Sequence, residues 1–232
     1  AMGVMVHSQL AKSMVNQLEG APPCVVIPQV MPLRPTAGID MRARLQLSEE
    51  IVIFGAAGQI TAAKQIEQLL NAFAQLNRRY PNTHLLLIGE PIAGYPLDEL
   101  LFSSGVGERV TVTGFVETID HFMDWIGAAD VMVNCRFPTM GETSASVLRS
   151  FTCGRPVIVY DHGWYSELSS EVAMKIPVND GDELLKAMLE LTTQPQKRQK
   201  MGLAARKRIA RDHQPEAVAK QMAEFMLSII NV

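Results

Sequence analysis

Short apolar runs alternate with longer segments of helical periodicity from residue 51 to the end of the chain. Over residues 66–76, for example, apolar side chains recur at i, i+3, i+4, i+7 and i+10, which is the spacing of one face of a helix. Apolar runs that end at glycine or at a polar residue predict strands at 51–54, 85–88, 109–113, 130–134, 156–160 and 172–176. Helices are predicted at 66–76, 97–102, 118–127, 144–151, 182–193, 196–211 and 215–230.

This alternation of strands and helices predicts an α/β fold with a mainly parallel sheet. The strands are almost continuously apolar, so helices should cover both faces of the sheet. Sheets of this kind bind ligands beyond the carboxyl ends of their strands. The residues at those ends are Gly55-Ala56-Ala57-Gly58, Gly89-Glu90, Gly114-Phe115, Cys135-Arg136-Phe137 and Asp161-His162-Gly163.

The first part of the chain has a different organisation. A strand at 4–8, a helix at 9–18 and a strand at 25–27 are followed by a proline-rich stretch to about residue 43, which we interpret as a linker. A lone strand–helix–strand unit cannot bury its own apolar faces. We therefore expect residues 1–44 to be the remnant of an N-terminal domain plus a linker, and residues 45–232 to form a second domain.

Composition excludes several classes of protein. The chain is 47% apolar, which excludes intrinsic disorder, and its 21 Lys+Arg against 24 Asp+Glu leave no excess of positive charge for nucleic acid. Its three cysteines have no CxxC spacing, so we expect neither a zinc site nor a disulfide framework, and a reducing, cytoplasmic location. No apolar run is long enough to be a transmembrane segment, although peripheral membrane contact remains open.

The most informative stretch precedes the predicted helix that begins at Ser144. Gly141 permits a tight turn, and Thr143 or Ser144 can cap the helix, whose free N–H groups would then form an anion site at the edge of the sheet. Arg136 could bind a phosphate through two parallel hydrogen bonds, and Glu142 could accept hydrogen bonds from sugar hydroxyls. An ordinary helix cap with a surface glutamate is the alternative.

Five blocks of sequence resemble the glycosyl transferases group 1, the retaining glycosyltransferases of the GT-B fold. Gly-Glu-Thr-Ser-x-Ser from Gly141, continuing to Cys-Gly-x-Pro-Val from Cys153, is similar to a variant of the family signature. The other blocks occur in the same order and spacing as in the family, at 58–64, 85–89, 110–116 and 128–131. The resemblance covers about residues 48–212. It implies a Rossmann-like, doubly wound sheet that is the C-terminal domain of a GT-B fold.

The resemblance also implies roles for individual residues. Lys64, in a turn that contains Gly58, would bind the diphosphate of a nucleotide-sugar donor, where the local alternative is a solvated lysine in the first turn of a helix. Phe115 and Val116 would flank the base, and Gly89, at the end of the second matching block, would belong to the donor-binding set.

The signature segment would hold the rest of the donor. Glu142, the candidate catalytic residue, would bind the donor sugar or order the loop over its phosphates. The backbone amides of Thr143 and Ser144 would contact phosphate oxygens, and Gly141 and Arg136 would complete the donor-binding set.

Two positions depart from the family pattern. Gln59 replaces the usual second cationic phosphate ligand, and Arg149 replaces a glutamate that binds ribose hydroxyls. Arginine cannot accept those hydrogen bonds, although Arg136 and Arg149 could restore phosphate charge. If Arg149 points at the diphosphate, Arg149→Ala should weaken UDP or GDP binding at least about tenfold.

We therefore expect the donor-binding half of a glycosyltransferase that acts on a nucleoside-diphosphate sugar. It would transfer the sugar with retention to a glycan-type acceptor bound by an absent N-terminal domain, and it would be inactive alone. A nucleotide-sugar 2-epimerase-like isomerase and a non-catalytic nucleotide-binding module are the alternatives. No cofactor and no metal are expected, because Asp180 or Asp182 should cap a helix rather than bind a cation.

Overall fold

A parallel β-sheet forms the centre of the molecule. The computed structural model describes residues 2–34 and 40–230, and within these ranges the sheet has six strands in the order β5-β4-β3-β6-β7-β8. The strands are β3 (Val52–Ala57), β4 (Thr83–Ile88), β5 (Val110–Val112), β6 (Val131–Asn134), β7 (Val157–Tyr160) and β8 (Ala173–Ile176). All six lie where the apolar runs predicted them. The predicted α/β fold is confirmed.

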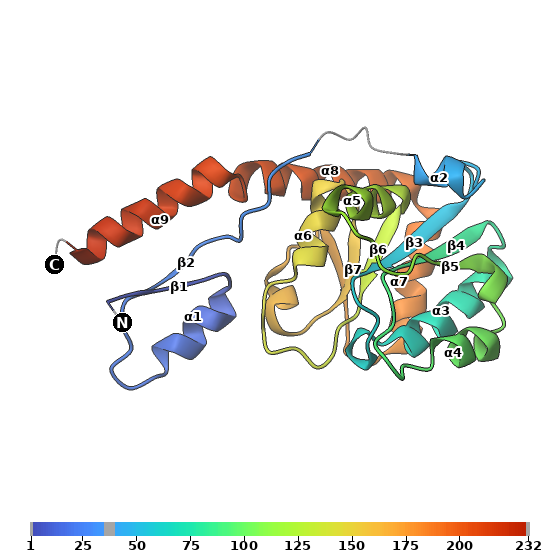
Figure 1. Ribbon diagram of the computed structural model, residues 1–232, viewed down its shortest axis with the longest axis horizontal. Coiled ribbons are helices and arrows are strands. Elements are labelled where there is room, and N and C mark those ends of the chain that lie inside the picture. The colour runs from blue at the N-terminus through green and yellow to red at the C-terminus, as the bar shows by residue number, and fades with distance from the viewer. Residues whose placement is uncertain (1, 35–39, 231–232) are drawn as a thin grey trace.

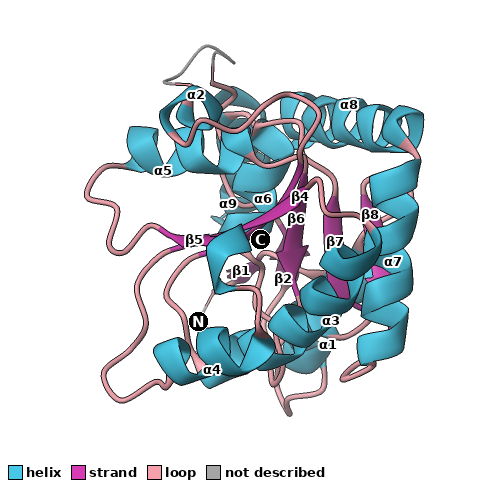
Figure 2. Ribbon diagram, turned by 90° about the vertical axis from the view of Figure 1, so that its right-hand side faces the viewer, coloured by secondary structure: helices cyan, strands magenta, loops and turns pink. Residues whose placement is uncertain are grey.

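Helices cover both faces of the sheet (Figure 2). One face packs against α3 (Ile66–Arg79), α4 (Leu97–Ser104) and α7 (Gly181–Thr193). The other packs against α2 (Met41–Arg44), α5 (Ile119–Ala128), α6 (Ala145–Thr152) and α8 (Pro195–Asp212). Alternate side chains of β3 point to opposite faces, so Phe54 joins the first core and Ile53 the second. This two-sided burial explains why the strands are almost purely apolar.

The strand order changes direction between β3 and β6. From β3 the chain proceeds outward through β4 to β5, and it then returns to the other side of β3 to build β6, β7 and β8. A reversal of this kind separates the loops that leave two adjacent strands, which opens a crevice at their carboxyl ends. This topology places the expected crevice between the loops that follow Ala57 and Asn134.

The N-terminal segment stands apart from this sheet. Strand β1 (Val4–Val6), helix α1 (Gln9–Asn16) and strand β2 (Cys24–Val26) form a parallel two-stranded unit. Helix α9 (Pro215–Ile230) leaves the main body and runs beside this unit (Figure 1). Its Phe225 ring lies directly against Gly3, where a Cβ atom would be only 2.9 Å from the ring. The segment before β1 and the helix α9 are therefore in contact.

The stretch interpreted as a linker ends in a short helix that the sequence pattern did not predict. Residues 35–39 fall outside the described residues, and α2 begins directly after them, with Asp40 capping it through a hydrogen bond from the N–H of Ala43. Met41 is 2% exposed and belongs to the core beneath α5. Four residues are too few to show helical periodicity. The domain boundary near residue 44 stays a prediction.

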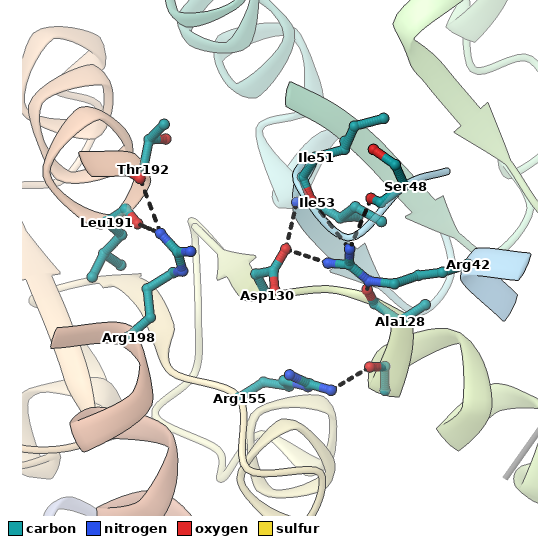
Figure 3. Close-up of polar contacts among 11 residues, drawn as sticks. Arg42, Ser48, Ile51, Ile53, Ala128, Asp130, Arg155, Leu191, Thr192 and Arg198 are labelled. Carbon is teal, nitrogen blue, oxygen red and sulfur yellow. Dashed lines mark hydrogen bonds and ion pairs between the residues drawn. The ribbon is translucent and has the colours of Figure 1, made fainter. Parts of the chain in front are cut away.

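A charged network ties α2 to the amino-terminal edge of the sheet (Figure 3). Asp130, just before β6, accepts hydrogen bonds from Arg42 and from the backbone N–H of Ile53, the latter at 2.8 Å. Arg42 also donates to the carbonyl oxygen of Ala128 at 3.0 Å. Nearby, Arg198 donates hydrogen bonds to the carbonyl oxygens of Leu191 and Thr192 at the end of α7. This network lies at the opposite edge of the sheet from the crevice.

In the parts of the chain that the structure describes, no helix is both long and apolar enough to cross a membrane.

Candidate functional site

Two glycines meet at the carboxyl ends of β3 and β4. Gly58 has a φ of +98° and donates a hydrogen bond from its N–H to the carbonyl of Ile88 at 2.8 Å. Gly89 has a φ of +147°, and a Cβ atom on it would lie 2.5 Å from the carbonyl oxygen of Gly58. Both the backbone conformation and this close approach require glycine. The predicted site residues Gly58 and Gly89 are therefore in contact.

Lys64 lies directly over the first of these glycines. Its ammonium group donates a hydrogen bond to the carbonyl oxygen of Ala57, and a Cβ atom on Gly58 would be 2.9 Å from the Lys64 Nζ atom. Burial, and secondarily the positive charge of Arg136, lower the pKa of Lys64 to about 8. An ordinary solvated lysine would not show this shift. Gln65, at φ +52°, lies between the 3-10 turn that ends at Lys64 and helix α3.

The loop after β6 is fastened to the turn that carries Lys64. The N–H of Phe137 donates to the carbonyl of Ala63 at 2.8 Å, and the side-chain amide of Gln65 donates to the carbonyl of Phe137 at 3.0 Å. These two bonds bring Arg136, the residue before Phe137, close enough to Lys64 to affect its ionisation. Two cations from loops 72 residues apart thus share the crevice.

Three neighbouring groups hold the carboxylate of Glu142. Its Oε2 accepts hydrogen bonds from the hydroxyl of Thr139 at 2.6 Å and from the N–H of Met140 at 2.8 Å, and its Oε1 pairs with Arg136 at 2.8 Å. Partial burial alone would raise the pKa of this carboxyl. The bonds from Thr139 and the backbone, together with the charge of Arg136, outweigh burial and lower the pKa below its usual value. The side chain is therefore an ionised acceptor at neutral pH.

Helix α6 begins at the same loop. Ser144 is its N-cap: its hydroxyl accepts a hydrogen bond from the N–H of Val147 and another from Asn134 at 2.9 Å. The N–H groups of Ala145 and Ser146, in the first turn, have no intrahelical acceptor. The hydroxyl of Thr143 donates to the carbonyl of His7 at 3.3 Å, so the N-terminal segment reaches this loop.

Residues 50–194 match the family of glycosyl transferases group 1. The chain belongs to this family.

The curated relatives are named for the transfer of different sugars. The α-D-kanosaminyltransferase of Streptomyces kanamyceticus is 25% identical over 79% of this chain and 47% of its own length. A GDP-mannose-dependent α-(1-6)-phosphatidylinositol monomannoside mannosyltransferase of Mycobacterium tuberculosis is 25% identical over 90% of this chain and 55% of its own length. This group 1 glycosyltransferase chain thus spans about half the length of the curated relatives it matches.

Solved structures share the fold. Sucrose-phosphate synthase from Thermosynechococcus elongatus superposes with a TM-score of 0.84 at 23% identity, over 99% of this chain and 58% of that one. Anabaena HepE, solved in complex with UDP, gives a TM-score of 0.85 at 18% identity, over 98% and 64%. The sheet of this group 1 glycosyltransferase is thus that of the Rossmann-like C-terminal domain of GT-B enzymes.

The remaining predicted residues lie around the same edge. Gln59 is exposed beside Gly58, and Phe115 is 70% exposed after the end of β5. Val116 is partly buried against the core under α5. Gly141, at φ +86°, is buried in the loop that carries Glu142. Their contacts with a donor stay predictions.

Arg149 is surrounded by an aromatic ring and a second arginine. Its guanidinium lies over the ring of Phe122 on α5, 5.8 Å from the centroid. Burial and then the positive charge of Arg34 lower its pKa. Arg34 in turn pairs with Asp120, in the first turn of α5. Arg149 therefore belongs to a cluster between α5, α6 and the segment before α2. A role for Arg149 at the diphosphate stays a prediction.

The sequence did not reveal several groups that contact or support the candidate site residues. The carbonyl of Ala57, the hydroxyl of Thr139 and the carboxylate of Glu167 all contact site residues or their supports, but backbone atoms and isolated loop residues give no periodic signal. The interpretation of Asp180 as a helix cap is confirmed, because its carboxylate accepts the N–H of Glu183 at 2.9 Å.

Proposed function

We propose that this chain binds a nucleoside-diphosphate sugar and is the donor-binding half of a glycosyltransferase that transfers the sugar, with retention, to a glycan-type acceptor. The observation that carries the proposal is that two cations, Lys64 and the Glu142-paired Arg136, are brought together by the joined β3 and β6 loops, beside the start of α6. Two cations and the N–H groups of a helix start offer complementary charge to a diphosphate.

The same groups are suited to stabilising the diphosphate as a leaving group when the sugar is transferred. When the bond from the sugar to the diphosphate breaks, negative charge grows on the leaving phosphate oxygen. Lys64, Arg136 and the first turn of α6 would stabilise that charge without moving, because their loops are already joined. We propose that this electrostatic support makes a metal ion unnecessary.

We assign Glu142 a role in orientation. Because the carboxyl is ionised, accepts two hydrogen bonds and pairs with Arg136, it is suited to fixing the loop and accepting bonds from sugar hydroxyls. An epimerase would require an acid or base with a pKa near neutrality, and the lowered pKa of Glu142 does not favour that alternative.

The acceptor would bind elsewhere. The relatives are about twice as long as the part this chain matches, so we propose that acceptor recognition and part of catalysis lie in a partner domain. The purified 232-residue chain should bind nucleotide without turnover. Transfer of radiolabelled sugar by this chain alone would contradict that part of the proposal.

A non-catalytic nucleotide-binding module is the second candidate. Gln59 removes one cation from the crevice, and Arg149 removes a carboxylate acceptor. In a full-length protein, nucleotide binding without hydrolysis or transfer would favour this module.

Calorimetry against UDP, GDP, ADP and their sugars tests the proposed function. HepE was solved with UDP and a mycobacterial relative is named for GDP-mannose, so the panel covers both bases. We expect one nucleotide to bind, and Lys64→Met to weaken it by about tenfold or more. Lys186→Met, on the exposed surface of α7, is the matched control. If no nucleotide binds to the wild-type chain, the proposal is wrong.

A further inference from the structure

Three segments from distant parts of the chain meet at the loop that carries Glu142. Residues 7–10, at the start of α1, form the first, and loop 139–144 is the second. The 3-10 helix Gly163–Glu167 is the third. Within this junction, a Cβ atom on Gly141 would be 2.6 Å from Cδ2 of Leu10, and one on Gly163 would be 3.0 Å from the methyl group of Thr139. The three segments are therefore packed in direct contact.

Glu167 is the polar centre of the junction. Its Oε1 accepts a hydrogen bond from the N–H of Leu10 at 2.9 Å, and its Oε2 accepts one from the N–H of Gln9 at 3.0 Å. Both donors belong to the first turn of α1, where N–H groups have no intrahelical acceptor. Ser8 satisfies the next N–H, that of Ala11, through its hydroxyl.

This arrangement suits a carboxylate in particular. A glutamate presents two oxygens to two parallel donors, and its negative charge is favoured at the positive end of a helix. Glutamine offers only one oxygen and no charge, and alanine offers neither. The two bonds join residues 157 and 158 positions apart, so they fix the N-terminal segment to the second domain rather than stabilise α1 locally.

We infer that Glu167 is a positioning residue of the donor site, which holds the start of α1 so that Leu10 and His7 press against the loop carrying Glu142. This inference rests on the proposed function, because it assigns Glu167 to the donor site. Leu10 packs on Gly141, directly before Glu142, and the carbonyl of His7 receives the hydroxyl of Thr143, directly after it. The residues on both sides of Glu142 therefore contact the segment that Glu167 holds.

The positioning role differs measurably from simple helix capping. If Glu167 only caps α1, its loss exposes the amides of residues 9 and 10 to hydrogen exchange and changes nothing else. If it positions the loop, exchange at residues 139–144 accelerates as well, and donor affinity falls. Both measurements use the complete chain.

The variants are Glu167→Ala, Glu167→Gln and the control Glu171→Ala, which changes an exposed glutamate four residues away. For the nucleotide sugar that the wild-type chain binds among UDP-glucose and GDP-mannose, we expect Glu167→Ala to weaken binding by about tenfold and to accelerate exchange in both segments. Glu167→Gln should give an intermediate loss of about threefold because one acceptor remains. Glu171→Ala should match the wild type.

A double-mutant cycle with Leu10→Ala tests whether Glu167 affects donor affinity through the contact of Leu10 with Gly141. Because both side chains act through the same contact, the affinity loss in Glu167→Ala/Leu10→Ala should be smaller than the product of the two single losses. Unchanged affinity and unchanged exchange at residues 139–144 in Glu167→Ala would overturn the inference. If the wild-type chain binds no nucleotide, the proposed function fails first, and the exchange of residues 139–144 then decides the positioning role by itself.

Discussion

The ammonium group of Lys64 donates a hydrogen bond to the carbonyl oxygen of Ala57, the last residue of β3. This contact holds a partly buried cation at the carboxyl edge of the sheet, next to a second cation, Arg136. Burial and like charge both disfavour the protonated lysine. A group kept charged against such costs is suited to binding an anion.

Replacing Lys64 should separate binding from stability. In Lys64→Met the apolar stem is preserved and the disfavoured charge is removed, so we expect a melting temperature equal to or above that of the wild type at pH 7. Nucleotide affinity should fall by about tenfold or more. Differential scanning fluorimetry and calorimetry on the same samples measure both. A parallel loss of stability would show that Lys64 is structural.

Nucleotide affinity should fall as the pH rises from 7 to 9. The free site has a Lys64 pKa of about 8, and a bound diphosphate would raise this pKa. Above pH 8, binding must therefore take up a proton, and affinity should fall by up to roughly tenfold per pH unit. Calorimetric titrations at several pH values provide the profile. Lys64→Met serves as the control, and an equally steep profile in that variant would contradict the assignment.

The contact between Gly58 and Gly89 predicts an asymmetric cost of adding a methyl group. Gly89→Ala would place Cβ 2.5 Å from a backbone oxygen at φ +147°, so we expect a loss of at least about 2 kcal/mol in the free energy of unfolding. Gly94→Ala also has a positive φ but meets no atom within 4 Å, and it should cost about 1 kcal/mol. Urea denaturation distinguishes them. Equal losses would mean that the close approach is unimportant.

The network at the other edge of the sheet should affect stability alone. Asp130→Asn keeps an acceptor for the N–H of Ile53 but removes the charge that pairs with Arg42. We expect a loss of about 1–3 kcal/mol in urea denaturation, with nucleotide affinity unchanged. Glu49→Gln, at an exposed turn, is the control. A change in affinity would reveal coupling between the two edges.

The sequence pattern predicted the sheet, the helices longer than one turn and the sheet edge at which the candidate residues lie. Gly58, Lys64 and Glu142 could be brought together in advance because carboxyl ends of parallel strands share an edge. The direction of the Arg149 side chain could not be predicted, because it depends on the Phe122 ring on a neighbouring helix. The bonds of Glu167 to α1 were equally inaccessible, because they join isolated residues across most of the chain.

The packing of Phe225 against Gly3 has a mechanical consequence. The N-terminal unit is attached to the main body by the covalent chain after β2 and also by α9, which runs beside it (Figure 1). The bonds of Glu167 to α1 are a third attachment. The N-terminal unit is thus fastened at Gly3, after β2 and at the start of α1, so the far end of the chain contributes to holding Leu10 against Gly141.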